Sequence, residues 1–123
     1  SAFGMLGLPY ETRSLVFETI EVFRKCQPRT YAVGIYKPFL GSHLRKMCIK
    51  EGFFDPLNDN YIYPDHESVL NMPKFPKKEI EGLYRTFYLY TRLPYEQFPI
   101  LKQAEKDDKV LEELVRKYRG KDN

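Results

Sequence analysis

The feature that most constrains this chain is a strand–helix–strand pattern at its start. Residues 3–8 form a short apolar run, and Val16, Ile20 and Phe23 then recur at helical spacing. Residues 30–36 form a β-branched and aromatic run that is typical of a strand. Two strands joined through a helix form a βαβ unit, whose strands must run parallel. We therefore predict an α/β fold.

A second loop and helix follow this unit. Leu44, Met47 and Cys48 form a short apolar stripe that closes at Gly52. The pattern of strand, loop and helix therefore repeats, and we assign residues 1–54 to a βαβα arrangement.

The remaining residues change in character twice. Residues 55–75 are rich in Pro, Asn and Asp, which predicts an irregular covering loop. Residues 76–119 show helical stripes, which predict an all-helical extension, and residues 120–123 are expected to be a disordered tail. The longest stripe consists of Ile80, Leu83, Tyr84, Phe87 and Tyr90.

The charge pattern and the length of the apolar runs argue against two classes of partner, nucleic acids and membranes. The chain has 20 basic and 17 acidic residues and a net charge of +3. Because the two signs are interspersed, we expect a solvated mixed surface and no nucleic-acid binding. No apolar run approaches the roughly 20 residues that span a bilayer, so we expect no membrane partner.

The cysteines and histidines do not have metal-ligand spacing. Cys26 and Cys48 are far apart, and we expect both to be partly buried, reduced thiols, which favours a cytoplasmic location. His43 and His66 are interpreted as surface or capping residues. The acidic residues of the covering loop, Asp59 among them, are interpreted as solvated turn residues. We therefore predict no metal ligands in this chain.

The turn after the first strand is the most informative segment. Gly7-Leu8-Pro9-Tyr10-Glu11-Thr12 stands between a strand and a helix, where ligands of parallel α/β proteins collect. Glycine at position 7 would let the backbone approach a ligand. The carboxylate at position 11 would interact favourably with the positive end of the helix dipole at the helix N-terminus. The alternative is a strand-to-helix turn with no ligand.

Three motifs in order resemble radical S-adenosylmethionine (SAM) enzymes. The first is Gly-Leu-Pro-x-Glu-Thr after an apolar strand, and the second is the strand 31–36 followed by Pro38-Phe39-Leu40-Gly41-Ser42-His43-Leu44. The third, residues 68–73 with the helix 83–90 and Leu93-Pro94, is similar to the C-terminal extension of the cobalamin-binding subgroup. The resemblance extends to about residue 106.

The resemblance implies the C-terminal part of a partial (β/α)6 barrel, of which residues 1–54 hold the fifth and sixth strands. The adenine side of a SAM site would be lined by six residues. These are Gly7, Leu8, Pro9, Glu11, Ile35 and Tyr36. The contacts would be backbone hydrogen bonds and apolar packing, so no catalytic acid, base or nucleophile is predicted here.

The cluster motif of this superfamily is absent from the sequence. Three closely spaced cysteines hold the [4Fe–4S] cluster that cleaves SAM, and two isolated cysteines cannot replace them. The chain opens with Ser1 and a predicted strand, so we expect a fragment whose N-terminal half carries the cluster and, in this subgroup, cobalamin. The fragment alone is expected to bind no cofactor, to be inactive and to self-associate through an exposed apolar patch.

The sequence is compatible with two functions. One is a fragment of a radical SAM oxidoreductase or transferase, whose substrate and reaction are not determined: methylation, ring formation and carbon-skeleton chemistry are all compatible with it. The other is a non-catalytic α/β and helical interaction module.

Overall fold

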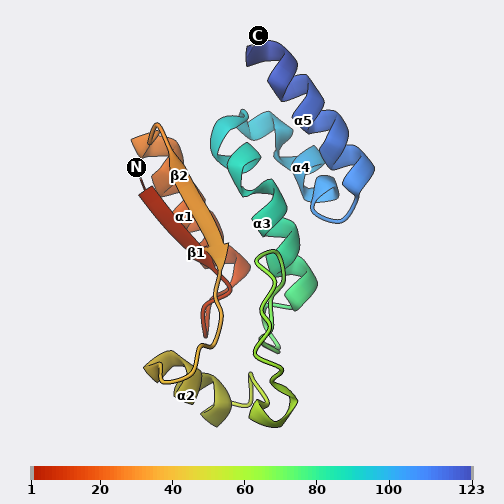
Figure 1. Ribbon diagram of the computed structural model, residues 1–123. Coiled ribbons are helices and arrows are strands. Elements are labelled where there is room, and N and C mark those ends of the chain that lie inside the picture. Colours follow the sequence, from red (N-terminus) through yellow and green to blue (C-terminus); the bar gives the residue numbers. More distant parts are fainter. Residues whose placement is uncertain (1, 123) are drawn as a thin grey trace.

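The computed structural model describes residues 2–122, which form a mixed α/β fold that is mostly helical (Figure 1). The elements are β1 (Ala2–Leu6), α1 (Arg13–Cys26), β2 (Tyr31–Ile35), α2 (His43–Lys50), η1 (Pro56–Asn58), α3 (Lys77–Arg92), η2 (Tyr95–Gln97), α4 (Phe98–Ala104) and α5 (Asp108–Asp122). The η elements are short 3-10 helices.

Strands β1 and β2 pair in parallel, as the strand–helix–strand pattern predicts. Their register places Phe3 opposite Ala32 and Leu6 opposite Ile35. β1 ends two residues earlier than expected, because Gly7 has a left-handed φ of 77° that turns the chain away from the sheet. A parallel pair requires a crossover connection, and α1 provides it.

Helix α1 covers one face of this sheet. The Thr12 side chain caps it by accepting a hydrogen bond from the Leu15 N–H, and Val16, Ile20 and Phe23 are buried, as predicted. The ring of Phe23 packs edge-to-face on Tyr31, with ring centroids 4.8 Å apart.

Helix α3 lies beside α1 and packs against both α1 and β2. It begins directly after Pro76, which lacks the N–H that an earlier helical turn would need, and it buries the predicted stripe except Tyr84, which is only partly buried. Ile80, Leu83, Phe87 and Tyr90 are each at most 1% exposed. The core therefore centres on α1, α3 and one face of the sheet, and buried residues of the covering loop and of α4 extend it.

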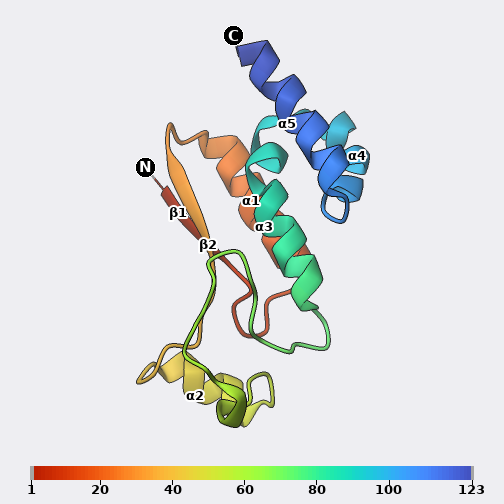
Figure 2. The same ribbon diagram turned by 45° about the vertical axis from the view of Figure 1, so that its right-hand side comes forward.

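Helix α2 does not pack on the sheet. It lies beyond the carboxyl ends of both strands (Figures 1 and 2). Its predicted apolar stripe is only partly right, because Cys48 is buried while Leu44 is 37% exposed and Arg45 is buried instead. The helix has only eight residues, and the buried ion pair of Arg45 directs its inner face toward the covering loop.

Two further expectations differ from the structure. Cys26 is exposed, because it is the last residue of α1 and lies outside the core stripe. Residues 120–122 belong to α5, which continues through Gly120 and ends at Asp122, so they are helical and not a disordered tail. The remaining tail residue, Asn123, lies outside the described residues.

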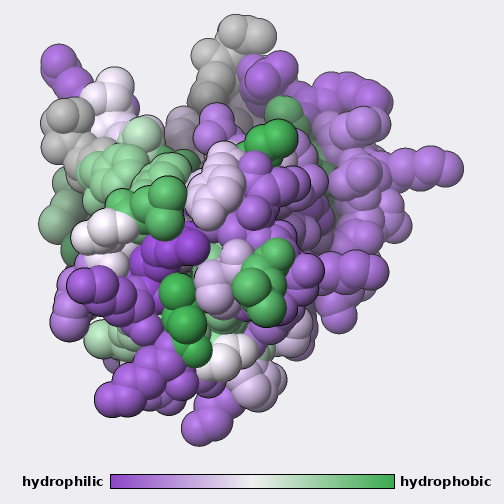
Figure 3. Space-filling model, turned by 60° about the horizontal axis from the view of Figure 1, so that its bottom comes forward, coloured by the Kyte–Doolittle hydropathy of each residue, from purple (hydrophilic) through white to green (hydrophobic). Residues whose placement is uncertain are grey.

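The second face of the sheet is open and apolar. Phe3 is 66% exposed, Met5 is 37% exposed, and Ala32 is also exposed. Figure 3 shows apolar side chains gathered on the side of the molecule where the sheet lies. Parallel sheets normally have both faces covered, so this face is unusual for a parallel sheet. Within residues 2–122, no helix has the length and apolar character needed to cross a membrane.

Candidate functional site

The loop between β1 and α1 is stabilised by its own carboxylate. Glu11 Oε1 accepts a hydrogen bond of 2.7 Å from the Gly7 N–H, and the Glu11 N–H donates to the Leu8 carbonyl at 3.0 Å. Burial raises the pKa of Glu11, although hydrogen bonds from the backbone of Gly7 and Leu8 act in the opposite direction. The carboxylate therefore stabilises the loop through a backbone hydrogen bond, whereas the sequence predicted that it would interact with the dipole at the N-terminus of α1.

The backbone of Gly7 lies close to α3, whereas the sequence suggested a close approach to a ligand. A Cβ atom at this position would lie 3.1 Å from Cγ2 of Ile80, so the glycine lets the loop pack on the first turn of α3. The Gly7 N–H is already bound by Glu11. Of the six predicted wall residues, Leu8 and Pro9 are half-buried and retain side-chain surface at this loop.

Tyr10 is in a strained conformation at the tip of this loop. Its φ is 67°, a left-handed value that costs a side-chain-bearing residue roughly 1–2 kcal/mol. The ring is 54% exposed and packs edge-to-face on Phe53, with centroids 5.5 Å apart. Sequence reasoning treated Tyr10 as a variable position, and no sequence pattern shows that its φ is positive.

The end of β2 meets the end of β1, as the predicted site requires. The Tyr36 N–H donates to the Leu6 carbonyl at 2.8 Å, which places Ile35 and Tyr36 beside the start of the β1–α1 loop. Both side chains are buried, Ile35 to 5% exposure and Tyr36 to 6%. The Tyr36 hydroxyl lies near Cys48 and Ser42 and meets hydrogen-bond geometry with neither, and burial raises its pKa. The ring of Tyr36 therefore faces α2 and is not free to line a ligand.

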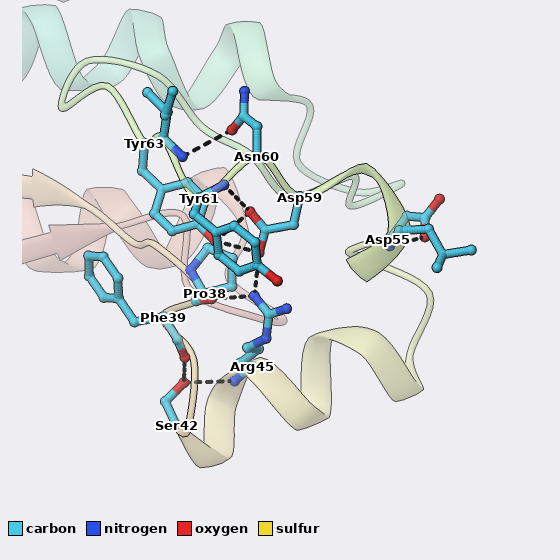
Figure 4. Close-up of polar contacts among 11 residues, drawn as sticks. Pro38, Phe39, Ser42, Arg45, Asp55, Asp59, Asn60, Tyr61 and Tyr63 are labelled. Atoms are coloured by element: carbon cyan, nitrogen blue, oxygen red, sulfur yellow. Dashed lines mark hydrogen bonds and ion pairs between the residues drawn. The ribbon is translucent and has the colours of Figure 1, made fainter.

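The covering loop is held to α2 by a group that we call the loop latch: Arg45, Asp59 and Tyr63. Arg45 Nη1 lies 2.7 Å from Asp59 Oδ2 and also donates to the Pro38 carbonyl at 2.9 Å (Figure 4). The Tyr63 hydroxyl donates to both oxygens of Asp59. The Asp59 side chain is fully buried, so it is not the solvated turn residue that the sequence suggested.

A second contact fixes the same loop to the end of β2. The ammonium group of Lys37 donates to the carbonyl of Pro64 at 2.7 Å and to that of Glu67. Burial lowers the pKa of Lys37. Together with the loop latch, this contact makes residues 55–75 a fixed wall. Neither Lys37-Pro38-Phe39 nor Arg45 forms a sequence pattern that predicts these contacts.

A second buried charge cluster joins α1, α3 and α4. The Arg13 guanidinium forms two hydrogen bonds of 2.8 Å with the carboxylate of Glu105, which is 4% exposed, and the Tyr90 hydroxyl donates to the same carboxylate. The pKa of Tyr90 is raised strongly, first by burial and then by Glu105. Every oxygen of this carboxylate has a partner, so the cluster serves packing and offers no free group for chemistry.

The side chains that commonly bind metal ions are dispersed over the described residues. Among the described residues, no group of three or more His, Cys, Asp or Glu side chains is placed to hold a metal ion. Both histidines are exposed, and the two cysteines are free thiols. Comparison of the chain with protein-family models, with curated proteins and with solved structures finds no match.

Proposed function

We propose that this chain supplies the fifth and sixth strands of a partial (β/α)6 barrel in a radical SAM enzyme of the cobalamin-binding subgroup. The observation that carries the proposal is the open apolar face of the sheet. α1 and α3 cover one face, as helices cover the outside of a barrel, while Phe3, Met5 and Ala32 stand exposed on the other. In a barrel this second face would be covered by the remaining strands and their side chains.

The strand ends support the same proposal. Loops at the carboxyl ends of parallel strands hold the ligands of such folds, and the β1–α1 loop adjoins the end of β2 there. Because the Gly7 N–H and the Glu11 carboxylate bind each other, the wall would meet an adenine ring mainly through the apolar surface of Leu8 and Pro9. Ile35 and Tyr36 would support this wall from behind.

The residues of this chain do not fit a [4Fe–4S] cluster. Three thiolates are required, and Cys26 and Cys48 lie on different helices, one exposed and the other buried with its pKa raised by burial. We therefore assign cluster binding to another part of the enzyme, and the chain alone would be inactive and would self-associate through its open face. Because Fe–S enzymes and free thiols require reducing conditions, we propose a cytoplasmic location.

The test uses the complete reading frame that encodes this segment. After anaerobic cluster reconstitution, the protein is reduced in the presence of SAM, and 5′-deoxyadenosine is measured. We expect a cluster absorbance and 5′-deoxyadenosine formation. Leu8→Ala should raise the KM for SAM without changing the cluster absorbance, whereas Leu57→Ala, at a side chain that is 92% exposed, should change neither.

A negative result would favour the interaction module. If no cluster forms, or if no upstream three-cysteine motif exists to hold one, the radical SAM proposal is wrong. The open face of the sheet would then be the surface that a separate partner chain covers.

A further inference from the structure

A small pocket of about 300 Å³ opens beside the tip of the β1–α1 loop. Its walls come from residues 10–12, from Phe53 after α2, and from residues 72–74 before α3. This volume is at the lower end of the roughly 300–1,000 Å³ that small-molecule pockets span. The pocket therefore suits a ligand of few atoms.

Two aromatic rings form a corner of this pocket. Tyr10 and Phe53 pack edge-to-face, with ring planes at 77° to each other, and both residues line the pocket. The thioether of Met72, which is 5% exposed, adds a polarizable wall. Because the Tyr10 ring is more than half exposed despite its strained backbone, burial in the core does not account for its position.

The charges around the pocket favour a cation. Glu11 lines it, and among the described residues no Lys, Arg or His lies within ion-pair distance of its carboxylate. Glu51 lies beside the Tyr10 hydroxyl and adds a second negative charge. Lys74 is the one cation in the lining, and its side chain is exposed, so its ammonium group can extend into solvent.

We propose that this pocket binds a small methylated ammonium cation against the corner that the rings of Tyr10 and Phe53 form. Such a cation is attracted to aromatic rings, loses little hydration when its methyl groups are buried, and complements the carboxylate of Glu11, which accepts a backbone hydrogen bond but has no cationic partner among the described residues. Binding of such a cation requires no part of the proposed cofactor chemistry, because it depends only on the pocket, its rings and its charges.

The experiment uses the full chain with ¹³C-methyl-labelled methionine, titrated with choline. The chain has three methionines, and only Met72 lines the pocket, so Met5 on the open sheet face and Met47 on α2 serve as internal controls. We expect a saturable shift of the Met72 methyl signal and none at the other two. The neutral isostere 3,3-dimethylbutan-1-ol should not shift Met72 at the same concentration, and neither should sodium chloride at matched ionic strength.

Three substitutions of Tyr10 test the role of the ring. Tyr10→Phe and Tyr10→Leu carry the same backbone strain, so they form a matched pair that differs in the π face. Tyr10→Phe should keep the affinity for choline, and Tyr10→Leu should weaken it by about two- to fivefold, the range of an exposed cation–π contact. Tyr10→Gly should abolish the Met72 shift while the chain stays folded, because glycine accepts the φ of 67° without strain.

Three results would overturn the proposal. The first is an equal response of Met72 to choline and to the neutral alcohol, which would indicate a merely apolar pocket. The second is an equal affinity of the Tyr10→Phe and Tyr10→Leu variants. The third is an unchanged Met72 signal across the choline titration.

Discussion

Glu105→Gln is expected to destabilise the chain by about 2–3 kcal/mol. The carboxylate is 4% exposed, receives both Nη groups of Arg13 at 2.8 Å, and accepts a hydrogen bond from Tyr90. An amide at this position has one acceptor oxygen and places an N–H₂ group against a donor. The substitution therefore breaks a paired contact while keeping the side-chain volume.

The magnitude follows from how much of the pair remains solvated. Removing one partner of a buried ion pair costs about 3–5 kcal/mol, because the other charge is left unpaired. Here the Arg13 side chain is 28% exposed and keeps a second partner, Glu79, at 3.3 Å. Both features reduce the cost to about 2–3 kcal/mol, which corresponds to a fall in Tm of roughly 6–15 °C for a chain of this length.

The assay is urea unfolding followed by far-UV circular dichroism. The midpoint should fall with an unchanged slope, because the substitution alters stability and not the surface exposed on unfolding. Glu112→Gln is the matched control: it makes the same chemical change at an exposed position of α5, and its effect should stay within about 0.5 kcal/mol.

A double-mutant cycle separates the ion pair from other effects. Arg13→Gln and Glu105→Gln combined should cost less than the sum of the two single changes, with a coupling of about 1 kcal/mol or more. If Glu105→Gln behaves like the exposed control, or if the two changes are additive, the reasoning that this contact joins α1 to α4 is refuted.

Three further measurements test other parts of the structure. Gly82→Ala should destabilise the chain, because the new Cβ would lie 2.7 Å from the carbonyl oxygen at the end of α4, whereas Gly120→Ala, with open space around it, should be neutral or stabilising in urea unfolding. Burial opposes ionisation of Asp59, but hydrogen bonds from the other members of the loop latch hold its pKa below the usual range, so its stabilising effect is present above about pH 3.9 and lost as the pH falls through the folded value. The amide protection factors of residues 55–75 should therefore fall as the pH falls through the folded pKa of Asp59, and Asp59→Asn should lower them at pH 7; unchanged protection would contradict the latch. Iodoacetamide should modify the exposed Cys26 quickly and the buried Cys48 only after unfolding, since burial also raises the pKa of the latter, and equal rates would refute this assignment.

The helices and strands of the core could be predicted because their signals are local. Val16, Ile20 and Phe23 repeat at the period of a helix, and Thr12 offers a side-chain cap, so α1 needs no distant contact to be recognised. The parallel pairing of the strands follows from the helix between them. The six predicted wall residues lie at adjoining strand ends, and their role in binding stays a prediction.

Charged contacts could not be predicted, because they depend on residues far apart in the chain. Arg13 and Glu105 are 92 positions apart, and nothing near Arg13 indicates that its partner is at the end of α4. Arg45 is not part of the predicted apolar stripe, yet it is buried because Asp59 compensates its charge across the covering loop. Glu11 was assigned to the helix N-terminus, but the turn at Gly7 brings a backbone N–H within its reach first.

By itself the sequence determined the order and type of the elements, since periodicity, caps and breaking residues act over one or two helical turns. Three features depended on the tertiary structure alone. Helix α2 lies away from the sheet, residues 55–75 are held to α2 by the loop latch, and Tyr10 packs on Phe53 with a left-handed φ. The physical reason is distance: these outcomes depend on burial and on charge pairs between segments whose proximity only the folded chain establishes.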